Sequence, residues 1–156
     1  MTGVQTCALP IYQAYGIVGN LQVESYDDIR PWAQDGTGAY GIAQWQDDRL
    51  EDLKQFARDN QSDYTAFETQ LAFLVYELQH KERGNWQKVL SESVNGTPEE
   101  YASYFDKYVE RSSQEHNWVR QQKARALANN GYGDEDKTAD NRARSEERRV
   151  GKECRL

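Results

Sequence analysis

Residues 16–45 read GIVGNLQVESYDDIRPWAQDGTGAYGIAQW, and the architecture that we predict for the chain is built around this segment. It begins with apolar residues at helical spacing, namely Ile17, Val18 and Leu21. The predicted helix ends at Glu24 and Ser25, and a polar loop with two glycines leads to an apolar return at residues 40–45. A glutamate at a helix end, a loop and a glycine-led return that carries a glutamine together predict a cleft with one acid in its wall.

Both ends of the chain resemble translated sequencing adapters. Residues 1–11 read MTGVQTCALPI and residues 144–156 read RSEERRVGKECRL, and such artefactual segments do not contribute to a fold. We therefore expect the natural sequence to begin near residue 12 and to be an internal fragment of a longer protein. It should form one domain over residues 12–133, followed by a polar linker or tail at residues 134–143.

The composition excludes several classes of protein. The net charge is −7, and it becomes −9 without residues 144–156, which carry five basic and three acidic residues. Such a surface repels a phosphate backbone, so we expect no nucleic acid partner. Both cysteines lie in the adapter-like segments, which excludes disulfides and thiolate metal sites from the domain. No apolar run approaches the roughly 18 residues of a membrane span, so we expect a soluble protein.

Helical periodicity recurs along the rest of the chain. After the first helix, over residues 12–25, the pattern predicts helices at residues 48–60, 64–81 and 86–91, from Thr97 through the aromatic residues that follow it, and at 116–129. The fold class is thus mainly α, a single domain of five or six helices. At most a small β-hairpin is expected between residues 26 and 42.

Three details of these helices can be compared with a structure. Thr97 followed by a proline and two glutamates predicts a capped helix start. The helix at 64–81 should bury one apolar face, made of Phe67, Leu71, Leu74, Val75 and Leu78. The last helix should turn its apolar residues inward, namely Trp118, Val119, Ala126 and Leu127.

Short blocks in this order resemble the phage tail lysozyme domain. They are GNLQVES at residues 19–25, YGIAQW at residues 40–45 followed by Arg49, Gln70-Leu71 with Glu77-Leu78, and Phe105 with YVER at residues 108–111. The resemblance covers residues 14–127. More loosely, Glu-Ser followed by Gly-x-x-Gln is similar to lytic transglycosylases and goose-type lysozymes. The resemblance implies a lysozyme-like fold.

The resemblance also implies roles for individual residues. Glu24 would be the general acid that cleaves the β-1,4 bond between N-acetylmuramic acid and N-acetylglucosamine. The implied substrate-binding residues are Ser25, Tyr40, Gly41, Gln44, Tyr108 and Glu110. Among them, Gln44 and the backbone at Gly41 would hold the acetamido sugar, and Tyr40 could stack on a sugar face. For Trp45 we prefer a place in the core, and Arg49 could either touch substrate or form an ion pair within the fold.

The sequence leaves the second carboxylate open. A hydrolase needs a base about 6.5–9.5 Å from the acid or a nucleophile near 5 Å, whereas a lytic transglycosylase needs neither. A turn, a helix start or an ion pair is the ordinary alternative role for every candidate, and the candidates are Asp27, Asp28, Asp35, Asp47 and Glu110. A non-catalytic glycan-binding module of the same fold is the competing class.

The resemblance further implies a biological setting. The partner would be the glycan strands of peptidoglycan, and the domain would belong to a virion tail or to another extracellular, cell-wall-acting lytic protein with antimicrobial activity. No cofactor is implied. The two histidines, His80 and His116, lack any metal-ligand spacing, so no metal is expected.

Overall fold

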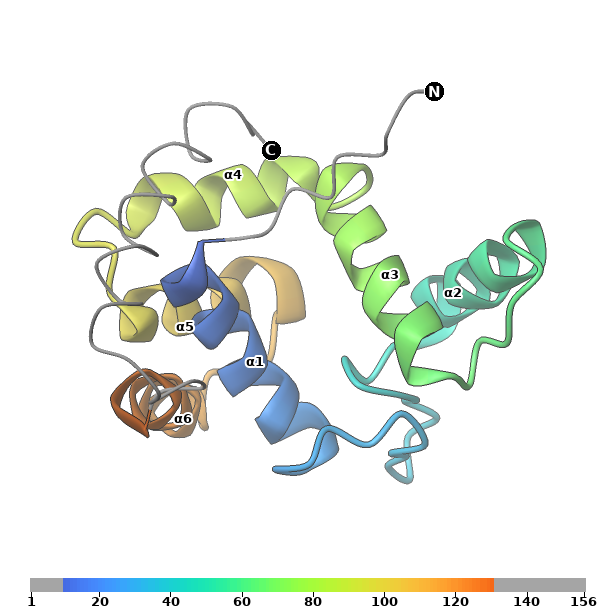
Figure 1. The fold of residues 1–156 in the computed structure, drawn as a ribbon, viewed down its shortest axis with the longest axis horizontal. Helices are drawn as coiled ribbons and strands as arrows, with labels where there is room; N and C mark the ends of the chain where they lie inside the picture. The colour runs from blue at the N-terminus through green and yellow to red at the C-terminus, as the bar shows by residue number, and fades with distance from the viewer. Residues whose placement is uncertain (1–9, 131–156) are drawn as a thin grey trace.

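The computed structural model describes residues 10–130 and confirms a mainly α architecture (Figure 1). This part of the chain forms six α-helices and one short π-helix, η1, which directly continues α5. The bounds are α1 Ile11–Ser25, α2 Asp47–Asp59, α3 Phe67–Gln79, α4 Arg83–Glu92, α5 Pro98–Phe105, η1 Asp106–Glu110 and α6 Asn117–Asn130. The predicted linker and almost all of both adapter-like segments lie outside the described residues.

The loop between α1 and α2 contains no strand. Instead it contains two isolated bridges, Gln34 with Tyr40 and Tyr40 with Trp45, besides several turn hydrogen bonds. In the second bridge each residue donates its N–H to the other's carbonyl at 3.0 Å. These bridges fold the loop back on itself, where the sequence allowed at most a small hairpin.

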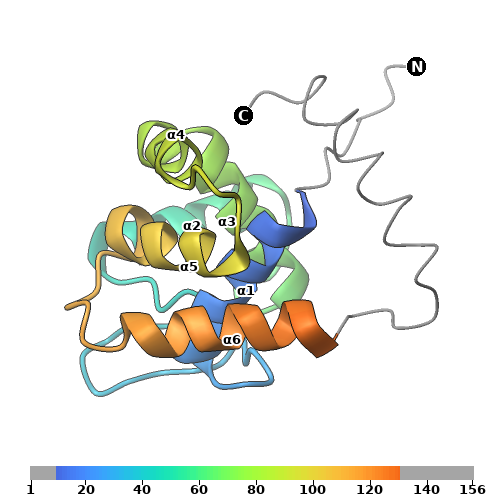
Figure 2. The same ribbon diagram turned by 90° about the vertical axis from the view of Figure 1, so that its left-hand side faces the viewer.

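Helix α1 lies at the centre of the molecule. Figure 1 shows α5 and α6 on one side of it and α2 and α3 on the other, and Figure 2 shows α6 running alongside the α1–α5 pair. Close packing against α6 depends on Gly19, because a Cβ there would lie 2.9 Å from the backbone nitrogen of Ala124. The core that surrounds α1 is apolar, and its largest fully buried side chains are Trp45, Trp86, Phe73 and Phe105.

The buried face of α3 differs from the predicted one. Leu74 and Leu78 are buried as expected, but Phe67, Leu71 and Val75 are each about 40% exposed. Gln70 and Glu77 point inward instead, because both satisfy buried polar groups of the loop and of α2. A buried donor or acceptor without a partner costs more than an exposed apolar side chain, so polar satisfaction sets the orientation of this helix.

The ends of the helices show where local signals hold. Thr97 caps α5 as predicted, since its Oγ1 accepts the N–H of Glu100 at 3.2 Å. Helix α3 begins three residues later than predicted, because Asp63 accepts the N–H and the hydroxyl of Thr65 and holds that segment in a turn. The predicted inward face of the last helix is wrong at two of its four residues, because Trp118 is 60% exposed and Ala126 is exposed as well. The buried residues of α6 are Arg120 and Ala124.

Candidate active site

Glu24 lies in the last turn of α1, where the chain turns away into the loop. Tyr26, the next residue but one, has a φ of 71°, which ends the helix abruptly. Ser25 is fully buried and donates its hydroxyl to the carbonyl of Leu21 at 2.8 Å, which stabilises this last turn. Ser25 therefore stabilises the helix turn that carries Glu24, and it does not line the two cavities described below.

A buried arginine binds one oxygen of Glu24. Arg120 of α6 is 3% exposed at its side chain, and its Nη2 donates to Glu24 Oε1 at 2.6 Å. Glu24 keeps 20% of its side chain exposed, so one carboxylate oxygen is anchored while the group still faces solvent. The ion pair fixes the direction in which Glu24 points.

Further buried groups hold Arg120 in place. Its Nη1 donates to the side-chain oxygen of Asn20 at 3.3 Å, and its Nε lies 3.4 Å from Asp106 Oδ2. Asn20 and Asp106 are both fully buried, and Asp106 also accepts the side-chain amide of Asn117 at 3.1 Å. Removing any of these groups would leave a buried charge or dipole unpaired.

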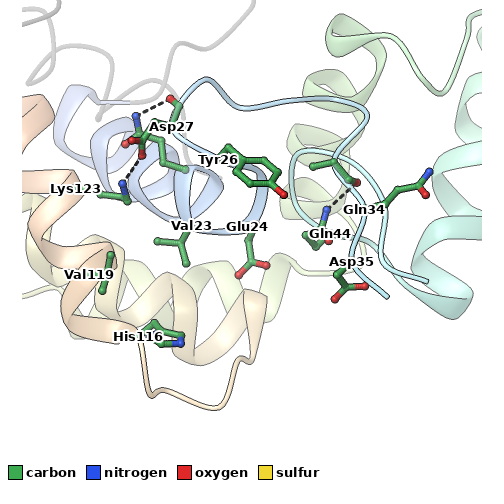
Figure 3. Close-up of a pocket in the computed structure, with 12 residues that line it drawn as sticks. Val23, Glu24, Tyr26, Asp27, Gln34, Asp35, Gln44, His116, Val119 and Lys123 are labelled. Carbon is green, nitrogen blue, oxygen red and sulfur yellow. Dashed lines mark hydrogen bonds and ion pairs between the residues drawn. The ribbon is translucent and has the colours of Figure 1, made fainter. Parts of the chain in front are cut away.

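Glu24 lines two adjoining cavities of about 520 and 410 Å³. Both cavities are also lined by Gln44 and Asp35, which come from the loop across from α1. Figure 3 shows Glu24 with Val119 of α6 and His116, the residue before α6, on one side and the two loop residues on the other. The structure thus brings the predicted acid and the predicted glutamine into one cleft.

The loop presents Gln44 in a constrained conformation. Its φ is 47°, and its amide nitrogen donates to the carbonyls of Ala33 and Gly41 at 3.0 and 2.9 Å. Both bonds use the nitrogen, which leaves the amide oxygen as the acceptor for a ligand. Gly41 has a φ of 85°, and the side chain that approaches it most closely is Gln70, whose Oε1 accepts the N–H of Ile42 at 3.0 Å.

Asp35 is an exposed carboxylate at the rim of the cleft. Its Oδ1 accepts three hydrogen bonds: the hydroxyl of Thr37 at 2.6 Å, the N–H of Thr37 at 2.9 Å and the N–H of Ala39 at 3.2 Å. These bonds hold the pKa of Asp35 below its usual value, and the bond from the Thr37 hydroxyl has the largest effect. Asp35 is therefore ionised at neutral pH. It stabilises the turn through one oxygen and also lines the cleft.

Glu110 has the opposite electrostatic setting. It ends η1, lines the smaller cavity with Glu24 and Arg49, and has a fully enclosed Oε1. Burial, and next the nearby Glu24 carboxylate, raise the pKa of Glu110 to about 8, although the guanidinium groups of Arg49 and Arg120 act in the other direction. The cleft thus holds one carboxyl group that favours ionisation and one that favours protonation.

The remaining predicted residues lie elsewhere. Tyr40 is half-buried and packs against Tyr64 with ring centroids 5.6 Å apart, and it lines neither cavity. Tyr108 also lines neither cavity: its hydroxyl donates to Glu92, and its ring stacks with Tyr104.

Trp45 is fully buried, as we preferred, and Arg49 binds both carboxylate oxygens of Glu77 at 2.9 and 3.0 Å. Of the other candidate carboxylates, Asp27 and Asp47 each line one of the two cavities and Asp28 lines neither. Asp27 lines the larger cavity and pairs with Lys123, whereas Asp28 pairs with Arg30 at 2.8 Å. Asp47 lines the smaller cavity and is the first residue of α2.

Arg120 is the functional residue that the sequence reasoning missed. It stands in a polar helix, and no local pattern distinguishes it from the exposed basic residues beside it. The one available signal was indirect: α6 has too few apolar residues on one face to be buried by them alone.

No group of side chains that could bind a metal ion occurs within residues 10–130. None of the helices in this range is both long and apolar enough to cross a membrane.

Comparison with known proteins agrees with this architecture. No curated protein and no solved structure matches the chain. A protein-family match, described as phage tail lysozyme, extends over residues 9–132, which includes every described helix and both walls of the cleft. The chain therefore belongs to the phage tail lysozyme family, with a lysozyme-like function directed at peptidoglycan.

Proposed function

We propose that this domain hydrolyses the β-1,4 bond between N-acetylmuramic acid and N-acetylglucosamine, with Glu24 as the general acid. The observation that carries the proposal is that Glu24 and Gln44 line the same two cavities, although they come from a helix end and from a separate loop return. A module that only binds glycan has no need of a carboxyl group held at the centre of its cleft.

The anchoring of Glu24 suits proton donation. Because Arg120 binds Oε1, the other oxygen, Oε2, is the one that can carry the transferable proton. That proton passes to the bridging oxygen as the glycosidic bond breaks, which makes the sugar alcohol a better leaving group. The amide oxygen of Gln44 accepts the N–H of an acetamido group and so holds the sugar against Glu24.

Asp35 is our candidate for the second carboxylate. Hydrolysis needs an ionised carboxylate opposite the acid, to activate water or to bond the sugar's anomeric carbon. The hydrogen bonds from Thr37 and Ala39 keep Asp35 ionised, and it lies across the cleft from Glu24. This setting favours a hydrolase over a lytic transglycosylase, in which the substrate's own hydroxyl attacks.

The variant Glu24→Gln tests the acid. The amide still accepts a hydrogen bond from Arg120 but cannot supply a proton, so peptidoglycan cleavage should fall by at least about 10²-fold. Purified peptidoglycan is digested and the soluble muropeptides are quantified by mass spectrometry. Glu68→Gln, an exposed position on α3 that loses the same charge, is the matched control and should keep full activity. Full activity of Glu24→Gln would remove Glu24 from the mechanism.

The same digest tests the role of Asp35. Reducing N-acetylmuramic acid ends indicate hydrolysis, whereas anhydro ends indicate transglycosylation. In Asp35→Asn the amide oxygen can still accept the three turn hydrogen bonds, so the loop should fold while hydrolysis falls by about 10²-fold. Anhydro products from the unaltered domain would exclude the hydrolytic role of Asp35 and leave that of Glu24 intact.

We also propose that the domain acts as part of a phage tail or a related lytic protein on the bacterial cell wall. What supports this setting is the family to which the chain belongs.

A further inference from the structure

Tyr26, the first residue after α1, has an unusual backbone conformation. Its φ is 71° and its ψ is 165°, a combination that is essentially restricted to glycine. Two hydrogen bonds of 2.9 Å fix this conformation: the N–H of Arg30 donates to the carbonyl of Ser25, and the N–H of Ile29 donates to the carbonyl of Tyr26. A bulky side chain therefore occupies a position at which it strains the backbone.

Burial does not compensate for this strain. Tyr26 is 57% exposed, and its hydroxyl makes no hydrogen bond with any residue in the range 10–130. Strained backbone conformations concentrate at sites that bind or process ligands, where the constrained residue has a role of its own. A role in binding therefore explains this tyrosine better than a role in folding.

The position of Tyr26 in the cleft agrees with such a role. Together with Glu24 and Gln44 it lines the larger cavity, of about 520 Å³. Figure 3 shows its ring beside Glu24, between the end of α1 and the loop that carries Gln44. Glu24 lines both cavities, whereas Tyr26 lines only the larger one. A glycan bound with its scissile bond at Glu24 therefore passes Tyr26 as it extends into the larger cavity.

Arg30 orients the ring of Tyr26 before any ligand binds. Its guanidinium carbon lies 4.7 Å from the ring centroid, and its Nε donates to both carboxylate oxygens of Asp28 at 2.8 and 2.9 Å. Arg30 lines neither cavity, so it does not occupy the space in which a ligand would bind. The guanidinium thus covers one face of the ring and leaves the other face available, and a ring that is already oriented loses less entropy on binding.

We propose that Tyr26 is a substrate-binding residue whose uncovered ring face stacks on a hexosamine of the glycan in the larger cavity. This inference rests on the proposed function, because it takes the cleft to be the glycan site. The substituents of a β-1,4-linked N-acetylhexosamine are equatorial, so both faces of the sugar ring present axial C–H groups. These groups are apolar and carry a small positive charge, which complements the negative face of an aromatic ring.

Binding of an uncleaved glycan tests the proposal. The Glu24→Gln domain is titrated in a calorimeter with chitohexaose, a soluble β-1,4-linked oligomer of N-acetylglucosamine. Adding Tyr26→Gly should raise the Kd about tenfold, because the stacking contact is lost, whereas Tyr26→Phe keeps the ring and should leave the Kd within about twofold. Trp32→Ala is the matched control: Trp32 is a 66% exposed aromatic residue of the same loop that lines neither cavity, and its removal should leave the Kd unchanged.

Thermal denaturation and kinetics separate a lost ligand contact from a lost fold. Glycine adopts the backbone conformation of residue 26 without strain, so Tyr26→Gly should melt at the same temperature as the unaltered domain or higher. With Glu24 intact, Tyr26→Gly should raise KM about tenfold and change kcat by less than about threefold, because the ground state and the transition state lose the same contact.

Several outcomes would overturn the inference. They are an unchanged Kd in Tyr26→Gly, a loss in Tyr26→Phe or in Trp32→Ala as large as that in Tyr26→Gly, and a lower melting temperature of Tyr26→Gly. Absence of any chitohexaose binding by the Glu24→Gln domain would overturn it as well. Full cleavage of peptidoglycan by Glu24→Gln would contradict the proposed function alone, since the binding measurement does not depend on which residue is the acid.

Discussion

Gly41 shows how a single residue positions the loop that carries Gln44. Its φ of 85° lies in the left-handed region, and a Cβ there would stand 2.7 Å from Oε1 of Gln70. Gln70 is fully buried and also donates to the carbonyls of Pro31 and Tyr64 at 2.8 and 3.0 Å, so it has little room to move. The glycine is needed for the fold, because it lets a buried amide brace the segment that carries Gln44.

We therefore expect Gly41→Ala to destabilise the domain by about 2–4 kcal/mol, from the left-handed backbone and the clash together. Urea denaturation followed by circular dichroism measures the loss. Gly36→Ala is the matched control, because nothing lies within 4 Å of a Cβ at that position, and it should change stability by less than about 0.5 kcal/mol. Equal stability of the two variants would show that Gln70 yields easily.

Among the helices, α5 shows a local signal that acts as the sequence predicts. Thr97 caps it, and Pro98 occupies the first turn, where a missing N–H has no cost. The continuation of α5 into η1 has no comparable signal, since a π-helix has no characteristic composition. This continuation places Asp106 toward Arg120 and Glu110 toward the cleft.

Thr97→Ala should lower the free energy of unfolding by about 1 kcal/mol, because the N–H of Glu100 loses its acceptor. Thr97→Ser keeps the hydroxyl and should recover most of the loss. Thermal denaturation of the three proteins at one pH measures both effects. A serine variant as unstable as the alanine variant would indicate that the threonine methyl group, and not the cap, is responsible.

Helix number, helix order and the meeting of Glu24 with Gln44 in one cleft were predictable, whereas the polar interior was not. Apolar periodicity located α3 and the burial of Leu74 and Leu78, but it missed the burial of Gln70 and Glu77, which have specific partners in the loop and α2. The burial of Arg120 was not predicted for the same reason, because its partners Glu24, Asp106 and Asn20 come from other helical segments. Hydrogen bonds between segments far apart in the sequence have no period, so a single sequence cannot reveal them.

For the molecule as a whole, Glu110 predicts how stability depends on pH. Its pKa is about 8 in the folded domain and near 4.5 when unfolded. Between these values the folded state keeps a proton that the unfolded state has lost, so this group lowers stability as pH rises from about 4.5 to 8 and adds no further loss above that. Glu110 thus makes the domain less stable at neutral and alkaline pH than it would be with a residue that does not titrate.

Glu110→Gln removes this titration and should stabilise the domain at pH 8 by roughly 1–3 kcal/mol, with little difference near pH 4. Melting curves of both proteins across this range measure the effect. A stability difference independent of pH would mean that Glu110 titrates alike in the folded and unfolded states.

The contact between Glu24 and Arg120 joins residues 96 positions apart, and that between Asn20 and Arg120 joins residues 100 positions apart. A ribosome synthesises α1 early and α6 late, so a nascent chain carries its acid long before the arginine that orients it. The cleft cannot be complete until α6 has left the exit tunnel and docked against α1. A chain released before residue 117 should therefore be inactive toward peptidoglycan and readily cut by protease.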